Sequence, residues 1–218
     1  MSSRSGIGGI VEGPGDEKAV PGLVRNILWE CHRFDLPVAQ AMRTGGQPFP
    51  LKKFKEYLRY AVAEGGKAIL VLLDADEECP REKAADLARE ATELHLNVPV
   101  AIVYAVQEYE TWFICSLAPD RGDRIREWLE LPAEATAPEC PETIRDAKGW
   151  LNRHMRRHRS YRATYDQEPL THRLELDLVR SRSRSFRRLW HAVEELVQAV
   201  DQGVATVTPQ SSFLQSDP

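Results

Sequence analysis

Acidic side chains follow three apolar segments of the sequence, each at the point where the apolar run ends. They are Glu12 after the first segment, Asp74 and Asp76 after the second, and Glu108 and Glu110 after the third. Carboxylates gathered in one cleft raise one another's pKa values unless a cation is present. Hard oxygen donors without His or Cys favour Mg²⁺ or Mn²⁺ over zinc. Pairs of such ions serve phosphoryl displacement, so the pattern predicts a metal-dependent phosphodiester hydrolase.

The first of these acids opens the segment Glu-Gly-Pro-Gly-Asp, which runs from Glu12 to Asp16. Its glycines could form a phosphate cradle, but the dinucleotide-binding pattern Gly-x-Gly-x-x-Gly is absent from this position. Asp16 stands where a helix N-cap belongs. We therefore expect the turn to free Glu12 from a strand and to begin a helix at Asp16, with both acids facing one cation. The backbone amides at the start of this helix could then contact a phosphate, but only in an accessory role.

The apolar periodicity predicts the elements that must position these acids. Strands are expected at residues 7–11, 38–43, 68–73 and 98–106, and helices at residues 17–31, 51–63 and 82–96. This alternation predicts an α/β fold of the Rossmann-like kind, with a mostly parallel sheet of four or slightly more strands flanked by helices. In such sheets the working cleft lies outside the carboxyl ends of the strands, so acids on neighbouring strands converge there. Because side chains alternate along an extended segment, Asp74 and Asp76 are expected to project the same way and to share a cation.

The pattern changes beyond Trp112. Helices are expected at residues 111–117, 144–157 and 174–200, residues 118–142 are expected to be irregular in part, and the polar tail from Val204 is expected to fray. The predicted organisation is an α/β core over residues 1–117, an Arg-rich, mainly helical C-terminal extension over residues 118–203, and a flexible tail over residues 204–218.

The charge of the chain is unevenly distributed. Residues 153–188 contain 11 arginines and 4 acids, a local charge of +7, which leaves −11 for the rest of a chain whose net charge is −4. A run of arginines is often only a solvated helix face. Aromatic residues interleave with this one, however, and aromatic planes stack on bases while guanidinium groups hold phosphates. We expect a nucleic-acid strand, DNA or RNA, to bind here, and Lys148 or Arg187 could also supply a cation for the transition state. The predicted contacts are Lys148, Arg153, Arg156, Arg157, Arg184 and Arg187.

The composition excludes several classes of protein. Hydrophobic residues make up 42% of the 218 residues and charged residues 28%, as in an ordinary globular protein. No apolar run approaches the roughly 20 residues that cross a bilayer, and residues 1–9 do not resemble a signal peptide, so a cytoplasmic location without a membrane partner is expected. The four cysteines form no Cys-x-x-Cys pair and are expected to be reduced thiols, with Cys31 and Cys115 buried.

Several segments resemble a known family. The Glu-Gly-x-x-Asp pattern of residues 12–16, followed by VLLDAD at residues 71–76, looks like the Toprim superfamily. The chain is more closely similar to the bacterial DUF4276 family, whose members are predicted to be Toprim-like. The resemblance extends to about residue 200, through VEGPGDEKAVPGLVRNIL, VQEYETWF, KGWLNRHM, YDQEPLT and SRSFRRLW.

This resemblance implies roles for individual acids. In Toprim domains the first glutamate, here Glu12, is a general acid or base or a metal ligand, and the Asp-x-Asp acids, here Asp74 and Asp76, bind Mg²⁺. In the nuclease branch found in overcoming-lysogenization-defect proteins, the acid corresponding to Asp16 helps to hold a second ion. The resemblance thus implies catalytic roles for Glu12, Asp74 and Asp76, with Mg²⁺ or Mn²⁺ as the cofactor.

Glu108 and Glu110 lie outside the Toprim motifs and are expected to be metal ligands by their strand-end position alone. Topoisomerases and primases of the superfamily carry a nucleophilic Tyr on a separate domain or a zinc module, which this chain lacks. A nuclease is therefore favoured, and relatives encoded beside ATPase genes suggest an ATPase partner and a defence role.

Two other functions remain open. The first is a catalytically weak Toprim-like subunit whose arginines and aromatics bind nucleic acid or a protein partner. The second is a receiver domain, which also gathers acids at strand ends. Receivers place their acidic pair after the first strand, whereas the pair Asp74 and Asp76 follows the third predicted strand, so this alternative is disfavoured.

Overall fold

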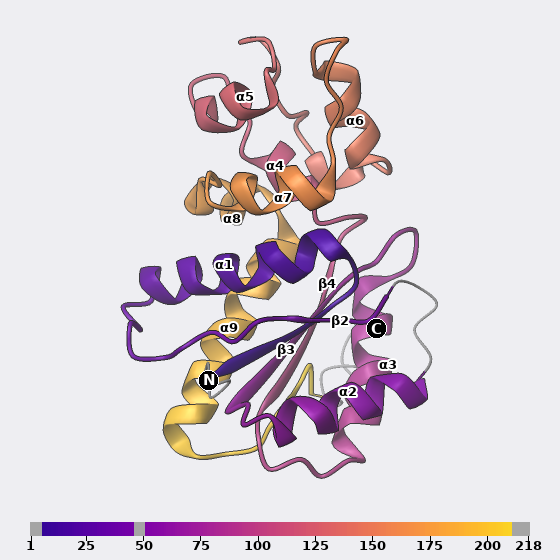
Figure 1. The fold of residues 1–218 in the computed structure, drawn as a ribbon, viewed down its shortest axis with the longest axis vertical. Coiled ribbons are helices and arrows are strands. Elements are labelled where there is room, and N and C mark those ends of the chain that lie inside the picture. Colours follow the sequence, from indigo (N-terminus) through magenta and orange to yellow (C-terminus); the bar gives the residue numbers. More distant parts are fainter. Residues whose placement is uncertain (1–5, 46–50, 211–218) are drawn as a thin grey trace, which may run out of the picture.

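A parallel five-stranded sheet forms the centre of the molecule. The computed structural model describes residues 6–45 and 51–210 (Figure 1). The strands lie in the order β2-β1-β3-β4-β5, and every neighbouring pair is parallel. Their bounds are β1 Ile7–Val11, β2 Met42–Arg43, β3 Ala68–Asp74, β4 Val100–Ala105 and β5 Val207–Thr208. The α/β fold class expected from the alternation is confirmed.

Helices cover both faces of this sheet. On one side lie α1 (Pro14–Glu30) and α9 (Arg184–Gln202), and on the other lie α2 (Leu51–Ala63) and α3 (Pro80–Thr92). The unbroken apolar run of β3 serves both layers. Leu70 and Leu72 belong to the apolar cluster that contains α1 and α9, and Ile69, Val71 and Leu73 belong to the cluster that contains α2 and α3. The core therefore consists of two apolar clusters separated by the sheet.

Short helices form a lobe beyond the carboxyl ends of the strands, in the upper part of Figure 1. They are α4 (Thr111–Cys115), α5 (Asp123–Leu129), the 3₁₀ helix η1 (Pro141–Thr143), α6 (Ala147–His154), α7 (Ala163–Thr171) and α8 (Leu176–Arg182). Trp112 anchors this lobe, since it is fully buried and its ring lies edge-on to Phe186 at 5.2 Å. The lobe joins the sheet layers through α9, which follows it in sequence and packs on β3 and β4.

The structure corrects the predicted helix over residues 174–200. Ser183 interrupts it with an extended backbone (φ −120°, ψ 124°), and its side chain accepts a hydrogen bond from the Phe186 amide as the N-cap of α9. The serine hydroxyl satisfies an amide that would otherwise lack a partner, which makes the break favourable. Helix α7 was not predicted, because Pro169 and a polar composition obscure its periodicity.

Two strand predictions also change. The segment 38–43 contributes only Met42 and Arg43 to β2, together with an isolated bridge between Val38 and Ile7. In the tail expected to fray, β5 pairs with Val100 and Ala101 of β4. Residues 211–218 of that tail lie outside the described residues.

The cysteines are free thiols, as expected. Cys115 is buried, whereas Cys31, expected to be buried as well, is only half-buried. None of the described helices is long and apolar enough to cross a membrane.

Candidate active site

The carboxyl ends of β1, β3 and β4 bring the predicted acids to one edge of the sheet. In the register of the sheet, Val11 lies beside Leu72, and Leu72 lies beside Val103. The chain runs outward from β1 to β2 and then returns to β3 on the other side of β1. Ligands bind at such switch points in open α/β sheets. Glu12 and Asp74 follow the two strands that flank it.

Asp74 is the centre of the acidic group. It is partly buried, and its Oδ1 accepts a hydrogen bond from the Tyr109 amide at 2.9 Å. Burial raises the pKa of the Asp74 carboxyl well above its ordinary value, and neighbouring charges add to the shift. The acids that raise the pKa of Asp74 are Asp16, Glu110 and Glu12, while Lys148 lowers it.

Asp16 is held by the first turn of α1 and by α7. Its Oδ2 accepts from the Gly13 amide at 2.8 Å, and Gln167 Nε2 donates to its Oδ1. The expected N-cap role of Asp16 is wrong, because the helix begins at Pro14, Gly13 is the N-cap and Asp16 closes a capping box from the third helical position. Burial raises the pKa of Asp16 in spite of these hydrogen bonds.

Gly15 lies between Gly13 and Asp16, and the close packing of this turn against α7 requires a glycine there. A Cβ atom on Gly15 would lie 2.9 Å from Ala163 Cβ and closer still to Gln167 Oε1. The turn therefore brings Gln167 onto Asp16, an arrangement that a side chain at position 15 would block.

Gly15→Ala is expected to lower the free energy of unfolding by about 1–3 kcal/mol, because the added methyl group forces α7 away from α1. Thermal or denaturant unfolding measures this loss. Gly8→Ala is the matched control, since a Cβ there meets its nearest neighbour at 3.8 Å. Equal stabilities of the two variants would contradict the packing argument.

Glu108 and Glu110 converge on Lys148, which α6 brings down from the lobe. Lys148 Nζ lies 3.3 Å from Glu108 Oε1 and 3.4 Å from Glu110 Oε2, and the Lys148 amide donates to Glu108 Oε2 at 3.2 Å. The Tyr161 hydroxyl donates to Glu110 Oε1 at 2.8 Å. Burial raises the pKa of Glu110 to about 6, although Lys148 and Tyr161 lower it. Burial lowers the pKa of Lys148, but the attraction of Glu110, Glu108 and Asp74 outweighs it and raises that pKa.

The extended backbone of Asp74 does not continue to Asp76. Asp76 is exposed, has a left-handed backbone (φ 49°) and lines a cavity at the edge of β4. The alternation of side chains holds only while the chain stays extended, and it ends at this left-handed residue.

The donor chemistry of the acidic group fits a hard divalent cation, but the side chains are not arranged as a finished metal site. Within residues 6–45 and 51–210, no three His, Cys, Asp or Glu side chains lie close enough together to hold an ion. The group offers only carboxylate oxygens, and the pKa values of Asp74, Asp16 and Glu110 are all raised. A cation would relieve that repulsion, which at present Lys148 relieves in part.

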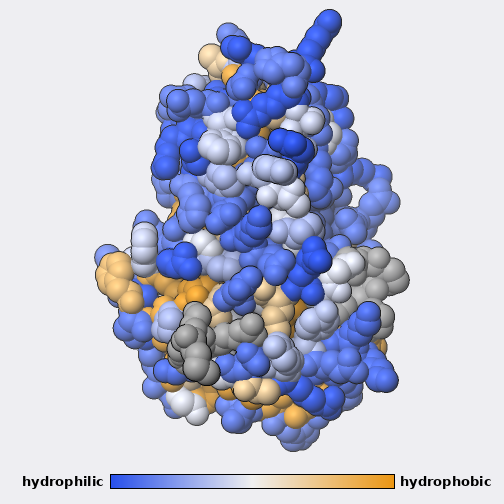
Figure 2. Space-filling model, viewed as in Figure 1, coloured by the Kyte–Doolittle hydropathy of each residue, from blue (hydrophilic) through white to orange (hydrophobic). Residues whose placement is uncertain are grey.

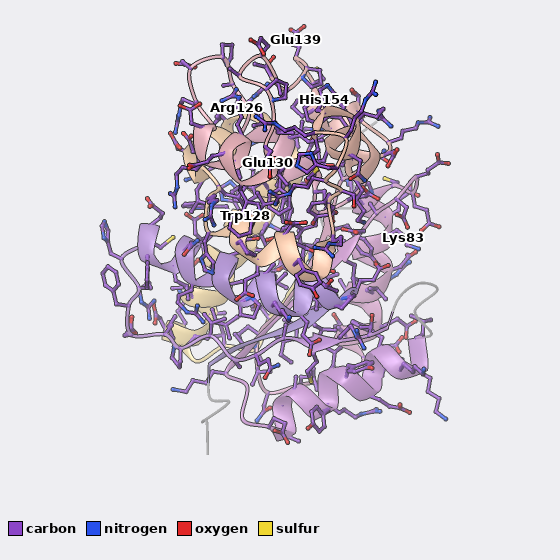
Figure 3. All side chains as sticks on the ribbon, turned by 45° about the horizontal axis from the view of Figure 1, so that its top comes forward. Lys83, Arg126, Trp128, Glu130, Glu139 and His154 are labelled. Carbon is purple, nitrogen blue, oxygen red and sulfur yellow. The ribbon has the colours of Figure 1, made fainter. Side chains whose placement is uncertain are left out.

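The predicted arginines come from two elements of the fold. Arg153, Arg156 and Arg157 lie at the end of α6 and just after it, whereas Arg184 and Arg187 lie in the first turn of α9. The lobe that carries the first group also carries Trp128, Glu130 and His154, labelled in Figure 3. The lobe is largely hydrophilic in Figure 2, where apolar colours are more frequent over the α/β core.

Sequence reasoning missed three residues that hold the acids in place. Tyr161 and Gln167 come from the lobe, and Tyr109 contributes its amide. Gln167 belongs to the segment YDQEPLT, which supports the family resemblance but indicates no chemical role for its residues. Gln167 and Asp16 are 151 residues apart in the sequence, so no local sequence pattern indicates that they are in contact.

Comparison with known protein families identifies a match over most of the chain. A family model described as "Domain of unknown function (DUF4276)" matches residues 11–194, a range that includes every acid of the site, Lys148 and Gln167. No curated protein matches the chain.

Proposed function

Because the chain belongs to the DUF4276 family, described as a domain of unknown function, we propose its function from the site itself: a metal-dependent nucleic-acid phosphodiesterase. One observation carries the proposal. The partly buried Asp74 lies at the switch point of a parallel sheet, within the field of three other carboxylates and one lysine. Such a cluster destabilises the fold at neutral pH, and active sites are where such perturbed groups gather.

Glu12, Asp16 and Asp74 would hold Mg²⁺ or Mn²⁺. When bound, such an ion polarises a phosphoryl oxygen and lowers the pKa of a water ligand. The protein's own part is to orient the carboxylates. The Tyr109 amide fixes Asp74, and the contacts of Asp16 with Gly13 and Gln167 fix the second acid.

Two further groups suit the chemistry of phosphodiester hydrolysis. With a pKa of about 6, Glu110 can accept or donate a proton near neutral pH. The Lys148 side chain is 42% exposed, so its ammonium group is accessible to a phosphate while it remains paired with the glutamates. A cation at this position stabilises charge that develops on the phosphoryl oxygens. In this proposal Glu108 and Glu110 orient Lys148, and their direct ligation of a metal remains a prediction.

A second candidate function is a nucleic-acid-binding subunit with little catalysis. It is favoured by the absence, among the described residues, of three side chains already placed to hold an ion. An ATPase partner and a defence role rest on the family resemblance, and both are compatible with either candidate function.

The test is cleavage by the purified protein. We expect it to cut DNA or RNA, offered as single and double strands, in the presence of Mg²⁺ or Mn²⁺ and to be inactive with EDTA. Calorimetric titration with Mn²⁺ is the companion measurement. Cleavage that persists in EDTA would contradict the proposal, and Mn²⁺ binding without cleavage of any strand would favour the binding subunit.

A further inference from the structure

A concave site lies beside the acidic group. It is a cavity of about 500 Å³ along β4, beyond the two residues of β4 that pair with β5. Its walls are the edge of β4, the start of α3 and the first turn of α9. A volume of this size suits a ligand of the dimensions of a nucleotide.

Two left-handed residues form one rim of this cavity. Asp76 (φ 49°) and Gln107 (φ 61°) face each other in an isolated antiparallel bridge, and the Asp76 amide donates to the Gln107 carbonyl at 3.0 Å. A non-glycine residue in this conformation is disfavoured, most clearly for glutamine. Two such residues bonded to each other are typical of backbone held in place for binding. Their side chains bring a carboxylate and an amide to the same rim.

The remaining walls combine apolar surface with positive charge. The partly exposed residues Pro80, Val106 and Pro209 supply the apolar part. The positive charge comes from Arg81, Arg184 and Arg188. Glu195 holds the Arg188 guanidinium through two hydrogen bonds of 2.9 and 3.1 Å. The Arg184 side chain is 82% exposed, and its nearest carboxylate is Glu142 at 3.7 Å. Of Arg184 and Arg188, Arg184 is therefore the guanidinium that a phosphate can engage more readily.

We propose that this cavity binds a nucleotide, with the base against Pro80, Val106 and Pro209, the base edge on Asp76 and Gln107, and a phosphate on Arg184. A nucleobase has flat apolar faces and a polar edge, and both features have counterparts in these walls. Carboxylates accept from exocyclic amino groups of bases, and side-chain amides make paired hydrogen bonds with them. The cavity thus assigns a role to Asp76, which lies apart from the metal-ligand candidates.

The cavity adjoins the acidic group closely enough to serve the same substrate. Asp74 and Asp76 are two residues apart, so no more than about 7 Å of chain separates them. A strand with one phosphate at Asp74 can therefore insert a neighbouring unpaired base into the cavity. This reading rests on the proposed function. It makes the substrate a single strand or a strand with an unpaired base, since a base within a duplex is not available to a pocket.

The experiment measures binding to the full-length protein without divalent ions, so that it does not depend on cleavage. Nucleoside monophosphates with each of the four bases are titrated, and a short single-stranded oligonucleotide is compared with versions that carry an abasic site at each position. The binding signal is expected to reach saturation with at least one of the two sets of ligands, the nucleoside monophosphates or the oligonucleotides. Arg184→Ala and Asp76→Asn should each weaken binding about tenfold or more, because each removes a charged hydrogen-bonding partner. Asparagine tolerates the left-handed backbone at position 76, so the fold is retained.

Arg145→Ala is the matched control, because Arg145 is also highly exposed and paired with one carboxylate but does not line the cavity. Binding of free nucleotides identifies the ligand as a mobile nucleotide. If only the oligonucleotide binds, and the loss of affinity from the abasic site does not add to the loss from Asp76→Asn, the ligand is a base of the strand. No binding, or binding that Arg184→Ala and Asp76→Asn leave at the wild-type level, would overturn the proposal.

Kinetics separate this inference from the proposed function. In a protein that cleaves, Asp76→Asn should raise KM or change the base preference while Mn²⁺ binding stays at the wild-type level. Cleavage with KM and base preference unchanged in Asp76→Asn would overturn the role of the cavity and leave the hydrolase intact. Nucleotide binding through the cavity without any cleavage would keep the cavity and remove the hydrolase.

Discussion

Asp74→Asn is expected to lower the rate of metal-dependent cleavage by roughly 10³-fold, because a metal ion contributes several kcal/mol of transition-state stabilisation and this substitution removes one of its proposed anionic ligands. The amide has the same shape as the carboxylate and retains an oxygen for the Tyr109 amide, so the loss is one of charge rather than of fold. Cleavage rates at saturating substrate, together with the affinity for Mn²⁺, measure the effect.

Glu77→Gln is the control for this experiment. Glu77 is exposed, follows the same strand and forms a surface ion pair with Arg145 at 3.3 Å. Its neutralisation should leave cleavage and Mn²⁺ affinity at the wild-type level. If Asp74→Asn cleaved as fast as Glu77→Gln, a metal at this edge of the sheet would be ruled out.

Without divalent ions, the ionisation of Glu110 is expected to cost stability as the pH rises. Its pKa in the folded protein is raised from 4.5 to about 6, so the folded state holds this proton to a higher pH than the unfolded state. The stabilising contribution of the proton is complete below about pH 4.5 and is lost as the pH passes 6. A shift of this size corresponds to roughly 2 kcal/mol.

The difference between Glu110→Gln and the wild type isolates this contribution. Relative to the wild type, the variant should gain roughly 2 kcal/mol of unfolding free energy between pH 4 and pH 7. Acids with lowered pKa values, such as Asp35 and Glu142, act in the opposite direction but are common to both proteins and cancel. Denaturant titrations at several pH values give the comparison. A difference that does not vary with pH would show that the environment of Glu110 does not disfavour its charge.

Addition of Mn²⁺ should reduce the same pH dependence in the wild type, because a cation among the carboxylates favours their ionised forms. The increase in the denaturant midpoint that Mn²⁺ causes at pH 7 should therefore exceed the increase that it causes at pH 4.

The layout of the sheet could be predicted from residue pattern alone, because β3 and β4 are continuous apolar runs and the helices between them have clear periodicity. The meeting of Glu12 with Asp74 also followed, since parallel strands end at one edge. Asp76 could not be placed in this way, because its position depends on a left-handed turn that side-chain alternation does not encode.

The parts of the site that come from the lobe were harder to predict for a different reason. Lys148 was singled out by its charge, but nothing in the sequence shows that Glu108 and Glu110 would be its partners. Gln167 lies on a helix interrupted by Pro169, and its contact with Asp16 spans most of the chain. Such contacts depend on how the lobe packs, which residue pattern does not determine.

The sheet is completed by elements that follow the lobe in the chain. The chain leaves the sheet after β4, builds the lobe, and only then returns with α9 and β5, so one face of β3 and β4 stays uncovered until about residue 202 has been synthesised. Contacts of such long range form late in folding. The acids of β1 and β3 can therefore exist early in synthesis, but Lys148 and Gln167 reach them only when the lobe docks. A nascent chain would carry these acids without the groups that position them until the lobe has been synthesised and has docked.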